Sequence, residues 1–539
     1  MDSGSQQVRD RSQAGPWSLR GVPPAALAAL AALTLLALAL RLLSLDQSLW
    51  GDEGFTWIVT GRDSVGGVVD AVRSSYEVTP PLYFVFAWLF RRLGDTPEMI
   101  RAPSVLAGTA LVPVVFVLGS RTLGWRVGLL ASALLALSPI AIYYSVEARN
   151  YSLLALILAL STLVLLRATT KGASRWWWLA FSLLTALAVY THYTSVFVIS
   201  GQFLWVLLFR RSHALWLLAS GLLVAALFVP WLPELERDTG ALGSVAIDRL
   251  YPLTARSYVR GCVAWIIGLP EASLLVVPGI EGLVLLAFSV AIAALSHLRS
   301  LRERSAGWAP NTADRTWLLV FLAAAAPLGT LAVSLVSNDI FLPRNLLSSL
   351  PAALIVLAGA AMSVRGTLRW GAVASLVLAF GVAAAFTFRA EAQRPNYRGV
   401  ARLIDQEAAP HTVVVIYSAL VGADWNQYTA FQARKPHTFL TLNLTNFYTS
   451  AVSPVAFDKQ GGLGRPLKVF PAGETLEGAA GALSRSRQNR EIFLVVPETP
   501  VFAAPRRIPG YERVGAQRVA GSIPLVVERY LRTASQMGR

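Results

Sequence analysis

Leu27-Ala-Ala-Leu-Ala-Ala-Leu-Thr-Leu-Leu-Ala-Leu-Ala-Leu40 is an apolar run, and Ser48-Leu-Trp-Gly-Asp-Glu-Gly-Phe55 follows it with two adjacent carboxylates, Asp52 and Glu53. A stretch of about 17–25 apolar residues is long enough to cross a bilayer as a helix, and this run begins at about residue 22. Ionised groups at a membrane boundary are costly to hold, so they usually have a partner or a task. The two stretches predict a membrane protein with a carboxylate pair just beyond its first span.

The composition supports the same class of protein. The chain has 539 residues, of which 55% are hydrophobic and 14% charged, whereas soluble proteins carry about 25% charged residues. The net charge of +16 fits basic cytoplasmic loops that contact anionic membrane lipids, and we expect no nucleic-acid partner. The single cysteine, Cys262, excludes an internal disulfide and any cysteine-rich metal site.

The apolar runs predict about eleven spans. They lie near residues 22–43, 102–120, 127–146, 151–167, 176–191, 194–209, 214–231, 274–297, 316–336, 346–363 and 369–388. The basic residues of the short loops fall on one side by simple alternation: Arg121 and Arg126; Arg167, Lys171 and Arg175; Arg210 and Arg211; Arg299, Arg302, Arg304 and Arg315; Arg365 and Arg369. By the positive-inside rule, we expect a multi-pass protein of a bacterial inner or plasma membrane with a cytoplasmic N-terminus.

The opposite side then holds the unusual segments and the C-terminus. Pro80-Pro-Leu-Tyr-Phe-Val-Phe-Ala-Trp-Leu-Phe90 is too short for a span, and we interpret it as an interfacial or re-entrant helix. The tail contains short β-branched runs at 412–417, 492–496 and 523–527 and a helical pattern at 397–408, which predict a small α/β domain. The expected organisation is a cytoplasmic arm (1–21), a membrane domain (22–390) with an outer loop (44–101), and an extracytoplasmic α/β domain (391–539).

Asp52 and Glu53 allow two interpretations. They could open a short helix, where carboxylates interact favourably with the helix dipole. They could also act at a membrane-facing cavity, as a general base or as a carboxylate that orients an acceptor. We expect both residues to be catalytic.

Further polar groups stand at other span boundaries on the same side. Arg149 lies between Glu147 and Tyr151, and Arg344 follows Asp339 in a later segment on that side. Aromatic and arginine side chains also anchor helices at the interface, which is the structural alternative. The functional interpretation is that the two arginines bind a lipid phosphate, because a planar guanidinium can bind two oxygens. Glu147, Tyr151 and Asp339 are then candidate substrate-binding residues.

His192 and Tyr193 end the predicted fifth span and complete the candidate substrate-binding set at this face. The five histidines show no ligand spacing, so we expect no zinc site. Two carboxylate pairs and two arginines suit displacement of a phosphate leaving group from a sugar: a base removes the acceptor's proton, and the cations stabilise the departing phosphate. The sequence contains no Gly-rich phosphate loop, so a nucleotide donor finds no support.

Five motifs between about residues 20 and 390 carry a family resemblance. They are Leu49-Trp-Gly-Asp-Glu-Gly54, Pro80-Pro-Leu-Tyr83, Ser145-Val-Glu-Ala-Arg-Asn-Tyr151, Thr191-His-Tyr193 and Leu342-Pro-Arg344. In them the chain resembles the GT-C superfamily of polyprenyl-phosphate-sugar glycosyltransferases. It is more similar to the branch of protein O-mannosyltransferases and lipid A aminoarabinose transferase (glycosyltransferase family 39-like). Thr79 stands where many relatives carry His or Lys, which shifts the expected donor contacts to Arg149 and Arg344.

The resemblance implies a GT-C-like fold and an inverting transfer of a monosaccharide, mannose or another hexose or pentose, from a polyprenyl-phosphate carrier. It implies that Asp52 is the catalytic carboxylate, Glu53 its neighbour and Tyr83 a substrate contact. The acceptor is a lipid, a glycan or a protein. A metal ion is not required across the branch, so a divalent cation, Mg²⁺ or Mn²⁺, stays open, and no cofactor is certain. The alternatives are a lipid-linked-sugar flippase or transporter, a ligase with a lipid-pyrophosphate glycan donor, and a scaffold.

Overall fold

The computed structural model divides the chain into two compact units. The residues that it describes are 21–49, 52–74, 77–240, 252–270, 272–303, 310–410, 412–418, 438–443, 468–469, 490–498, 510–521 and 524–533. The first unit comprises Met1–Leu45 and Arg62–Thr387, and the second comprises Asp46–Gly61 and Phe388–Arg539. The loop that carries Asp52 and Glu53 is therefore grouped with the C-terminal residues. The boundaries expected at residues 21 and 390 stay predictions.

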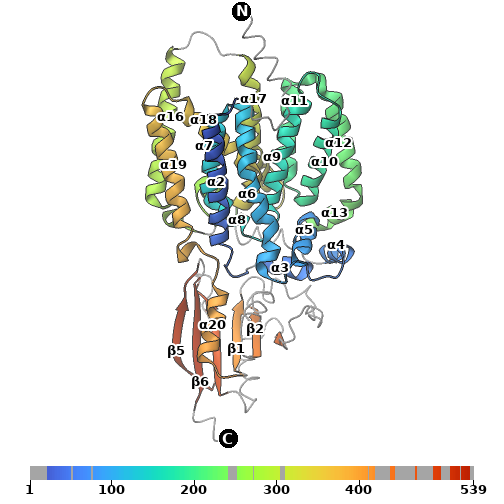
Figure 1. The fold of residues 1–539 in the computed structure, drawn as a ribbon. Coiled ribbons are helices and arrows are strands. Elements are labelled where there is room, and N and C mark those ends of the chain that lie inside the picture. The colour runs from blue at the N-terminus through green and yellow to red at the C-terminus, as the bar shows by residue number, and fades with distance from the viewer. Residues whose placement is uncertain are drawn as a thin grey trace, which may run out of the picture. The chain divides into compact units, whose positions relative to one another are not determined.

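The first unit is helical (Figure 1). Its helices are α2 (Pro24–Leu43), α4 (Val65–Ser74), α5 (Leu82–Arg91), α6 (Pro97–Thr122), α7 (Trp125–Leu137), α8 (Pro139–Ser145), α9 (Tyr151–Ala168), α10 (Trp176–Thr191), α11 (Ser195–Phe209), α12 (Ala214–Phe228), α13 (Leu232–Gly240), α15 (Ala255–Ile267), α16 (Ile280–Glu303), α17 (Pro310–Val336), α18 (Leu350–Ser363) and α19 (Leu368–Phe386). Short helical turns are η1 (Arg211–His213), η2 (Val229–Trp231), η3 (Leu275–Gly279) and η4 (Pro343–Ser349).

The predicted membrane-spanning architecture is confirmed. Within the described ranges, eight helices are long and apolar enough to cross a membrane, or nine if the bent pair α7–α8 counts as one span. Each predicted span coincides with one of these helices, with the bent pair, or with α10 or α11. The predicted number is larger because it includes α10 and α11, which have only 16 and 15 residues. The segment expected to be an interfacial helix forms the ten-residue helix α5.

The span predicted at 127–146 is not one straight helix. It breaks between Ser138 and Pro139, and α7 and α8 meet there at 61°. Proline has no N–H to donate, and its ring clashes with the preceding turn. Ser138 has φ −66° and ψ 121°, the extended region that a residue before proline prefers. The length of the apolar run predicted the span but not this break.

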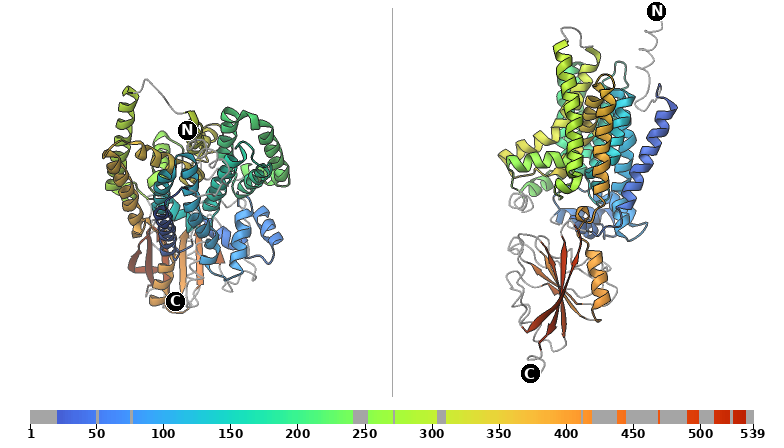
Figure 2. Two further views of the ribbon diagram at one scale, coloured as in Figure 1. Left: turned by 45° about the horizontal axis from the view of Figure 1, so that its top comes forward. Right: turned by 90° about the vertical axis from the view of Figure 1, so that its left-hand side faces the viewer.

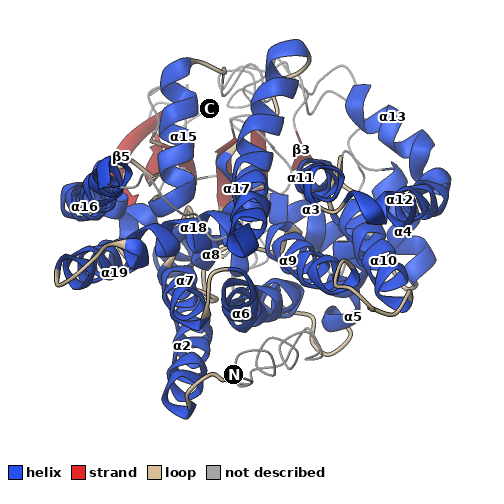
Figure 3. Ribbon diagram, turned by 90° about the horizontal axis from the view of Figure 1, so that it is seen from above, coloured by secondary structure: helices blue, strands red, loops and turns tan. Residues whose placement is uncertain are grey.

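Small residues allow the central helices to approach closely. A Cβ atom added to Gly119 on α6 would lie 2.6 Å from the Cα atom of Gly128 on α7, so the two backbones are in direct contact, as is common between membrane helices. In Figure 3, α2 lies at the margin beside α6 and α7. Helices α16 and α19 form a pair on one side, and α10 and α12 form a pair on another. The long α6 thus forms much of the central packing of this unit.

The second unit contains helices α3 (Asp52–Val59) and α20 (Tyr397–Glu407), the turn η5 (Ala390–Ala392) and one sheet. Its strands are β1 (Val413–Ser418), β2 (Thr438–Asn443), β3 (Lys468–Val469), β4 (Glu491–Pro497), β5 (Tyr511–Val519) and β6 (Leu525–Arg532), in the order β3-β2-β1-β4-β6-β5. The pairs β2–β3, β1–β2 and β1–β4 are parallel, whereas β4–β6 and β5–β6 are antiparallel. The expected α/β domain is confirmed.

Strand β4 and helix α20 form much of the described core of this unit. Val495 on β4 pairs with Ile416 on β1 and with Val527 on β6, so β4 is an interior strand. Ile492 to Val496 are all buried, the continuous apolar pattern of a strand covered on both faces. Helix α20 lies against one face of the sheet (Figure 2, right) and buries Val400 and Ile404, which recur at helical spacing.

Candidate active site

Asp52 and Glu53 occupy the first turn of α3, where the positive end of the helix dipole favours carboxylates. Glu53 is fully buried, and its Oε2 lies 3.9 Å from the guanidinium of Arg394, which is also fully buried. Both residues belong to the second unit. Arg394 was not among the predicted site residues, because nothing in its local sequence indicates a partner so distant along the chain.

Arg149 lies in the loop between α8 and α9, and a carboxylate holds its guanidinium end-on. Its Nη1 donates to Oε2 of Glu77 over 2.6 Å, and its Nη2 donates to Oε1 over 3.0 Å. Thr79 donates its hydroxyl to the same Oε1 over 2.6 Å. The side chains of Arg149 and Glu77 are 5% and 2% exposed, so this is a buried bidentate ion pair. Sequence reasoning missed Glu77, although an acidic residue shortly before Pro80-Pro81 was the available signal.

Three of the predicted site residues form a cluster centred on Tyr151. The guanidinium carbon of Arg344, on η4, lies 5.8 Å from the centre of the Tyr151 ring. The ring of His192 lies 5.7 Å from that same ring. Arg149 itself lies over Phe84 of α5, 5.7 Å from the ring centre. The fold therefore brings both candidate phosphate ligands to one cluster with two candidate substrate contacts.

Both arginines of the cluster also influence the protonation of His192. Burial first, then the charges of Arg149 and Arg344, lower the pKa of this histidine to about 3. It stands in the loop between α10 and α11, where its Nδ1 accepts a hydrogen bond from the main-chain N–H of Thr194 over 3.1 Å. The neutral ring therefore carries its proton on Nε2.

Two contacts fix the loop that carries Arg149. Ser104 on α6 donates its hydroxyl to the carbonyl of Arg149 over 2.9 Å, and the Tyr83 hydroxyl lies 2.8 Å from the same Ser104 oxygen. Asn150 donates its side-chain amide to the carbonyl of Thr191 over 2.9 Å. Tyr83 thus reaches the cluster through Ser104, and its predicted substrate contact stays a prediction.

The other candidate residues have the following surroundings. Glu147 is fully buried in the Arg149 loop. Asp339 accepts a hydrogen bond from the main-chain N–H of Phe341 over 2.8 Å and shapes the segment before η4. The Tyr193 hydroxyl donates to Asp238 of α13 over 2.7 Å and accepts from the indole of Trp231 over 3.0 Å. Burial and Asp238 raise the pKa of Tyr193 above its usual value.

Helix α13 reaches the Glu77 segment as well. Arg237, which forms an ion pair with Asp238 over 2.5 Å, donates to the main-chain carbonyl of Glu77 over 3.4 Å. Glu234 of the same helix pairs with Arg73 of α4 over 2.8 Å. The Arg149 cluster is thus supported from α4, α6 and α13, elements that lie far apart in the sequence.

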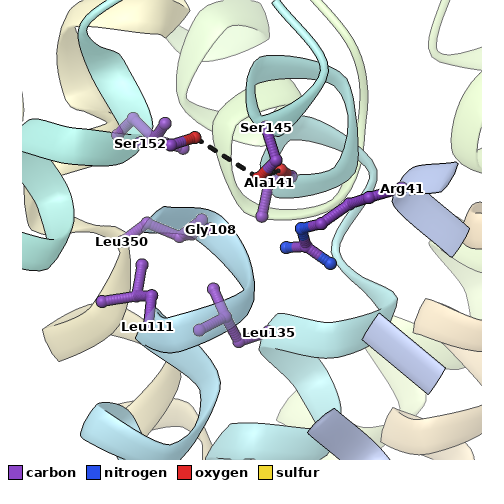
Figure 4. A pocket seen from close by; sticks show the side chains of 9 residues that line it. Arg41, Gly108, Leu111, Leu135, Ala141, Ser145, Ser152 and Leu350 are labelled. Carbon is purple, nitrogen blue, oxygen red and sulfur yellow. Dashed lines mark hydrogen bonds between the residues drawn. The ribbon is translucent and has the colours of Figure 1, made fainter. Parts of the chain in front are cut away.

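A second buried arginine lies elsewhere in the first unit. Arg41 stands in the last turn of α2, is fully buried, and faces a cavity of about 10 Å³ lined also by Gly108, Leu135 and Ser145 (Figure 4). Its Nη1 donates to the carbonyl of Ala37 over 2.9 Å. Within the described part of the chain, neither its Nε nor its Nη2 has a hydrogen-bond partner.

Among the described residues, no group of three or more His, Cys, Asp or Glu side chains is arranged to hold a metal ion. A divalent cation therefore stays an open prediction. Chemically, the Arg149–Arg344 cluster can bind and stabilise an anion with two oxygens or more. The carboxylates of α3 can accept a proton or orient a hydroxyl.

The chain is similar to known proteins in part of its sequence and in its fold. Residues 78–233 match the family model described as dolichyl-phosphate-mannose-protein mannosyltransferase, and this range includes Arg149 and His192. No curated protein sequence matches the chain. The fold is similar to that of ArnT from Cupriavidus metallidurans in the apo state, with a TM-score of 0.52, 14% identity, and coverage of 96% of this chain and 100% of that one.

The same enzyme bound to undecaprenyl phosphate matches with a TM-score of 0.52 and 15% identity, covering 94% of this chain and 99% of that chain. At this identity the likeness shows a common fold, and the match extends through the membrane helices and the C-terminal sheet. The family match adds a sequence signal over the helices that surround Arg149. The prediction made from sequence is confirmed to this extent: the chain has a GT-C-like fold and is a glycosyltransferase, similar in residues 78–233 to the mannosyltransferase family.

Proposed function

We propose that this protein transfers a monosaccharide, with inversion, from a polyprenyl-phosphate carrier to a hydroxyl of a lipid, glycan or protein acceptor. The observation that carries the proposal is the cluster in which Arg344 and His192 lie against the Tyr151 ring, and Arg149, held by Glu77, acts on His192 together with Arg344. The undecaprenyl phosphate in the ArnT structure of the same fold supports the choice of donor. The reaction then takes place at the extracytoplasmic face of the membrane, in the topology expected from the basic loops.

In this proposal the two arginines stabilise the phosphate that leaves. The bond between the anomeric carbon and the phosphate oxygen breaks, and the negative charge that develops on that oxygen is offset by Arg149 and Arg344. Glu77 holds the plane of the Arg149 guanidinium before the donor arrives, so little reorganisation is needed when the phosphate binds. Tyr151, Tyr83, Glu147, His192, Tyr193 and Asp339 are the proposed donor and acceptor contacts.

The acidic pair performs the other half of the reaction. Asp52 takes the proton of the acceptor hydroxyl as its oxygen bonds to the anomeric carbon, and Glu53 orients the acceptor beside it. The products are the glycosylated acceptor and the polyprenyl phosphate. A density map with bound donor tests whether Asp52 and the two arginines act on a single donor molecule.

The decisive experiment measures sugar transfer from a polyprenyl-phosphate donor by purified variants. Asp52→Asn should lower kcat by about 10²–10⁴-fold, the usual contribution of a general base. Asp63→Asn is the matched control, because Asp63 is an exposed carboxylate, and it should transfer sugar at the wild-type rate. Wild-type activity of the Asp52→Asn variant would remove Asp52 as the base.

Donor binding tests the arginines separately. Arg149→Lys keeps the charge but loses the planar fork, and it should weaken donor binding less than Arg149→Ala does. Unchanged donor affinity in Arg149→Ala would contradict a phosphate contact. Movement of lipid-linked sugar across vesicles without product would favour a flippase, and use of only a lipid-pyrophosphate glycan would favour a ligase.

A further inference from the structure

The residues just before the acidic pair are bound by the segment that leads into the C-terminal sheet. In this segment, which we call the stem (residues 388–398), the main-chain N–H of Arg394 donates to the side-chain oxygen of Gln47 over 3.1 Å. The main-chain N–H of Arg398 donates to the Ser48 hydroxyl over 3.0 Å. The Arg398 guanidinium also pairs with the carboxylate of Asp46. The loop of Asp46–Gly61 is therefore attached to the stem by both main chain and side chains.

Arg394 reaches further, to the acidic pair itself. Its guanidinium lies 3.9 Å from the Glu53 carboxylate, and both side chains are completely buried. A buried carboxylate without a nearby cation is strongly disfavoured, so this contact helps to determine where Glu53 stands. Because Asp52 and Glu53 are consecutive residues in the first turn of α3, whatever fixes one also constrains the other.

The other side of the stem packs against the sheet. A Cβ atom added to Gly521, in the turn between β5 and β6, would lie 3.1 Å from the carbonyl oxygen of Arg394 and 3.1 Å from the Cα atom of Pro395. Gly521 therefore packs directly against the backbone of the stem. Within the second unit, contacts run without interruption from the sheet through Arg394 to Glu53.

We infer that Arg394 is a positioning residue for the transfer reaction and that the C-terminal domain helps to hold the acidic pair in its working position. This inference rests on the proposed function, in which Asp52 takes the acceptor's proton. It assigns the C-terminal domain a role in the chemical step. It also predicts that the domain cannot be altered near Gly521 without an effect on the chemical step.

The test compares two arginines of the same stem. Arg394→Gln removes the cation beside Glu53, whereas Arg398→Gln removes one beside Asp46, whose side chain is 79% exposed. In folded, monodisperse protein, Arg394→Gln should lower kcat by about 10–100-fold, as expected for a small displacement of a reacting group, with the donor KM within about threefold of wild type. Arg394→Lys should restore part of kcat, and Arg398→Gln should stay within about twofold of wild type.

Two results would overturn the inference. One is a wild-type kcat for Arg394→Gln, and the other is an equal loss for Arg394→Gln and Arg398→Gln, which would indicate only a loosened stem. If Arg394→Gln does not fold, Arg394→Lys and Gly521→Ala decide: a lower kcat at unchanged donor KM supports positioning, and wild-type kcat in both refutes it. If Asp52→Asn and Glu53→Gln transfer sugar normally, the proposed function itself fails. If Asp52→Asn is inactive while Arg394→Gln is normal, only this inference fails.

Discussion

Glu77→Gln should be among the most destabilising single changes of a polar residue in the first unit. The substitution keeps the shape of the side chain and an oxygen that accepts the Thr79 hydroxyl, but it removes the charge that faces Arg149 over 2.6 and 3.0 Å. Removal of one partner from a buried ion pair costs about 3–5 kcal/mol, because the other charge stays buried. The lower figure already corresponds to a change of more than about 100-fold in the ratio of folded to unfolded protein.

Glu234→Gln provides the matched control. Glu234 pairs with Arg73 over 2.8 Å, but the Arg73 side chain is 42% exposed, and solvent screens such pairs to about 1 kcal/mol or less. Unfolding of detergent-solubilised protein can be followed by labelling of Cys262, the single cysteine of the chain. Equal midpoints for the two variants would refute the reasoning. The double variant Glu77→Gln, Arg149→Gln should recover part of the loss, because it leaves no isolated charge.

Three further predictions concern the packing of the first unit. The pKa of His192 is lowered from 6.5 to about 3 in the folded protein, so the unfolded chain binds a proton at a higher pH than the folded chain does. The free energy of unfolding should therefore fall as the pH drops from 6.5 toward 3, by up to about 1.4 kcal/mol per pH unit. In a series of denaturation curves at different pH, His192→Gln should flatten that decline. Gly119→Ala should destabilise the helical bundle, because the new Cβ atom would lie 2.6 Å from the Cα atom of Gly128. A Cβ atom at Gly381 would have nothing within 4 Å, so Gly381→Ala should leave the stability unchanged or raise it by about 0.5–1 kcal/mol. Thermal unfolding of the two variants compares these effects. Tyr83→Phe, which loses a 3.0 Å bond to the Ile100 carbonyl, should cost about 1 kcal/mol, measured in the same unfolding assay.

The parts of the fold that could be predicted from the sequence are those that depend on one short segment of the chain. A membrane span depends only on the length and polarity of one segment, so the apolar runs located the helices of the first unit. Strands β1, β4 and β6 follow from dense β-branched runs, and α20 follows from its apolar spacing. Strand β2, Thr438–Asn443, has the sequence Thr-Phe-Leu-Thr-Leu-Asn, with no dense β-branched run, and did not stand out. The break at Pro139 was overlooked because the hydrophobicity of the run hides a single proline.

Some residues of the candidate site could be predicted from the sequence, but their partners could not. Arg149 and Arg344 stand out in the sequence because the predicted topology places them on the side of the membrane opposite to the basic loops, and the fold brings them to one cluster. Their surroundings could not be predicted, because an ion pair such as Arg149–Glu77 joins residues 72 positions apart. The partner of Glu53, Arg394, is likewise specified only by the packing of the second unit. Sequence identified the charged groups that could react, and tertiary contacts determine which of them are neutralised.

The burial of Arg41 has a consequence for how the protein is made. In a newly inserted α2, an arginine in the last turn extends to the water interface along its apolar stem, and insertion scales penalise the residue less near a helix end than at the centre. Only when α6, α7 and α8 dock is the guanidinium removed from water. The electrostatic penalty therefore falls on the later, assembly stage of biogenesis, after α2 has already entered the bilayer.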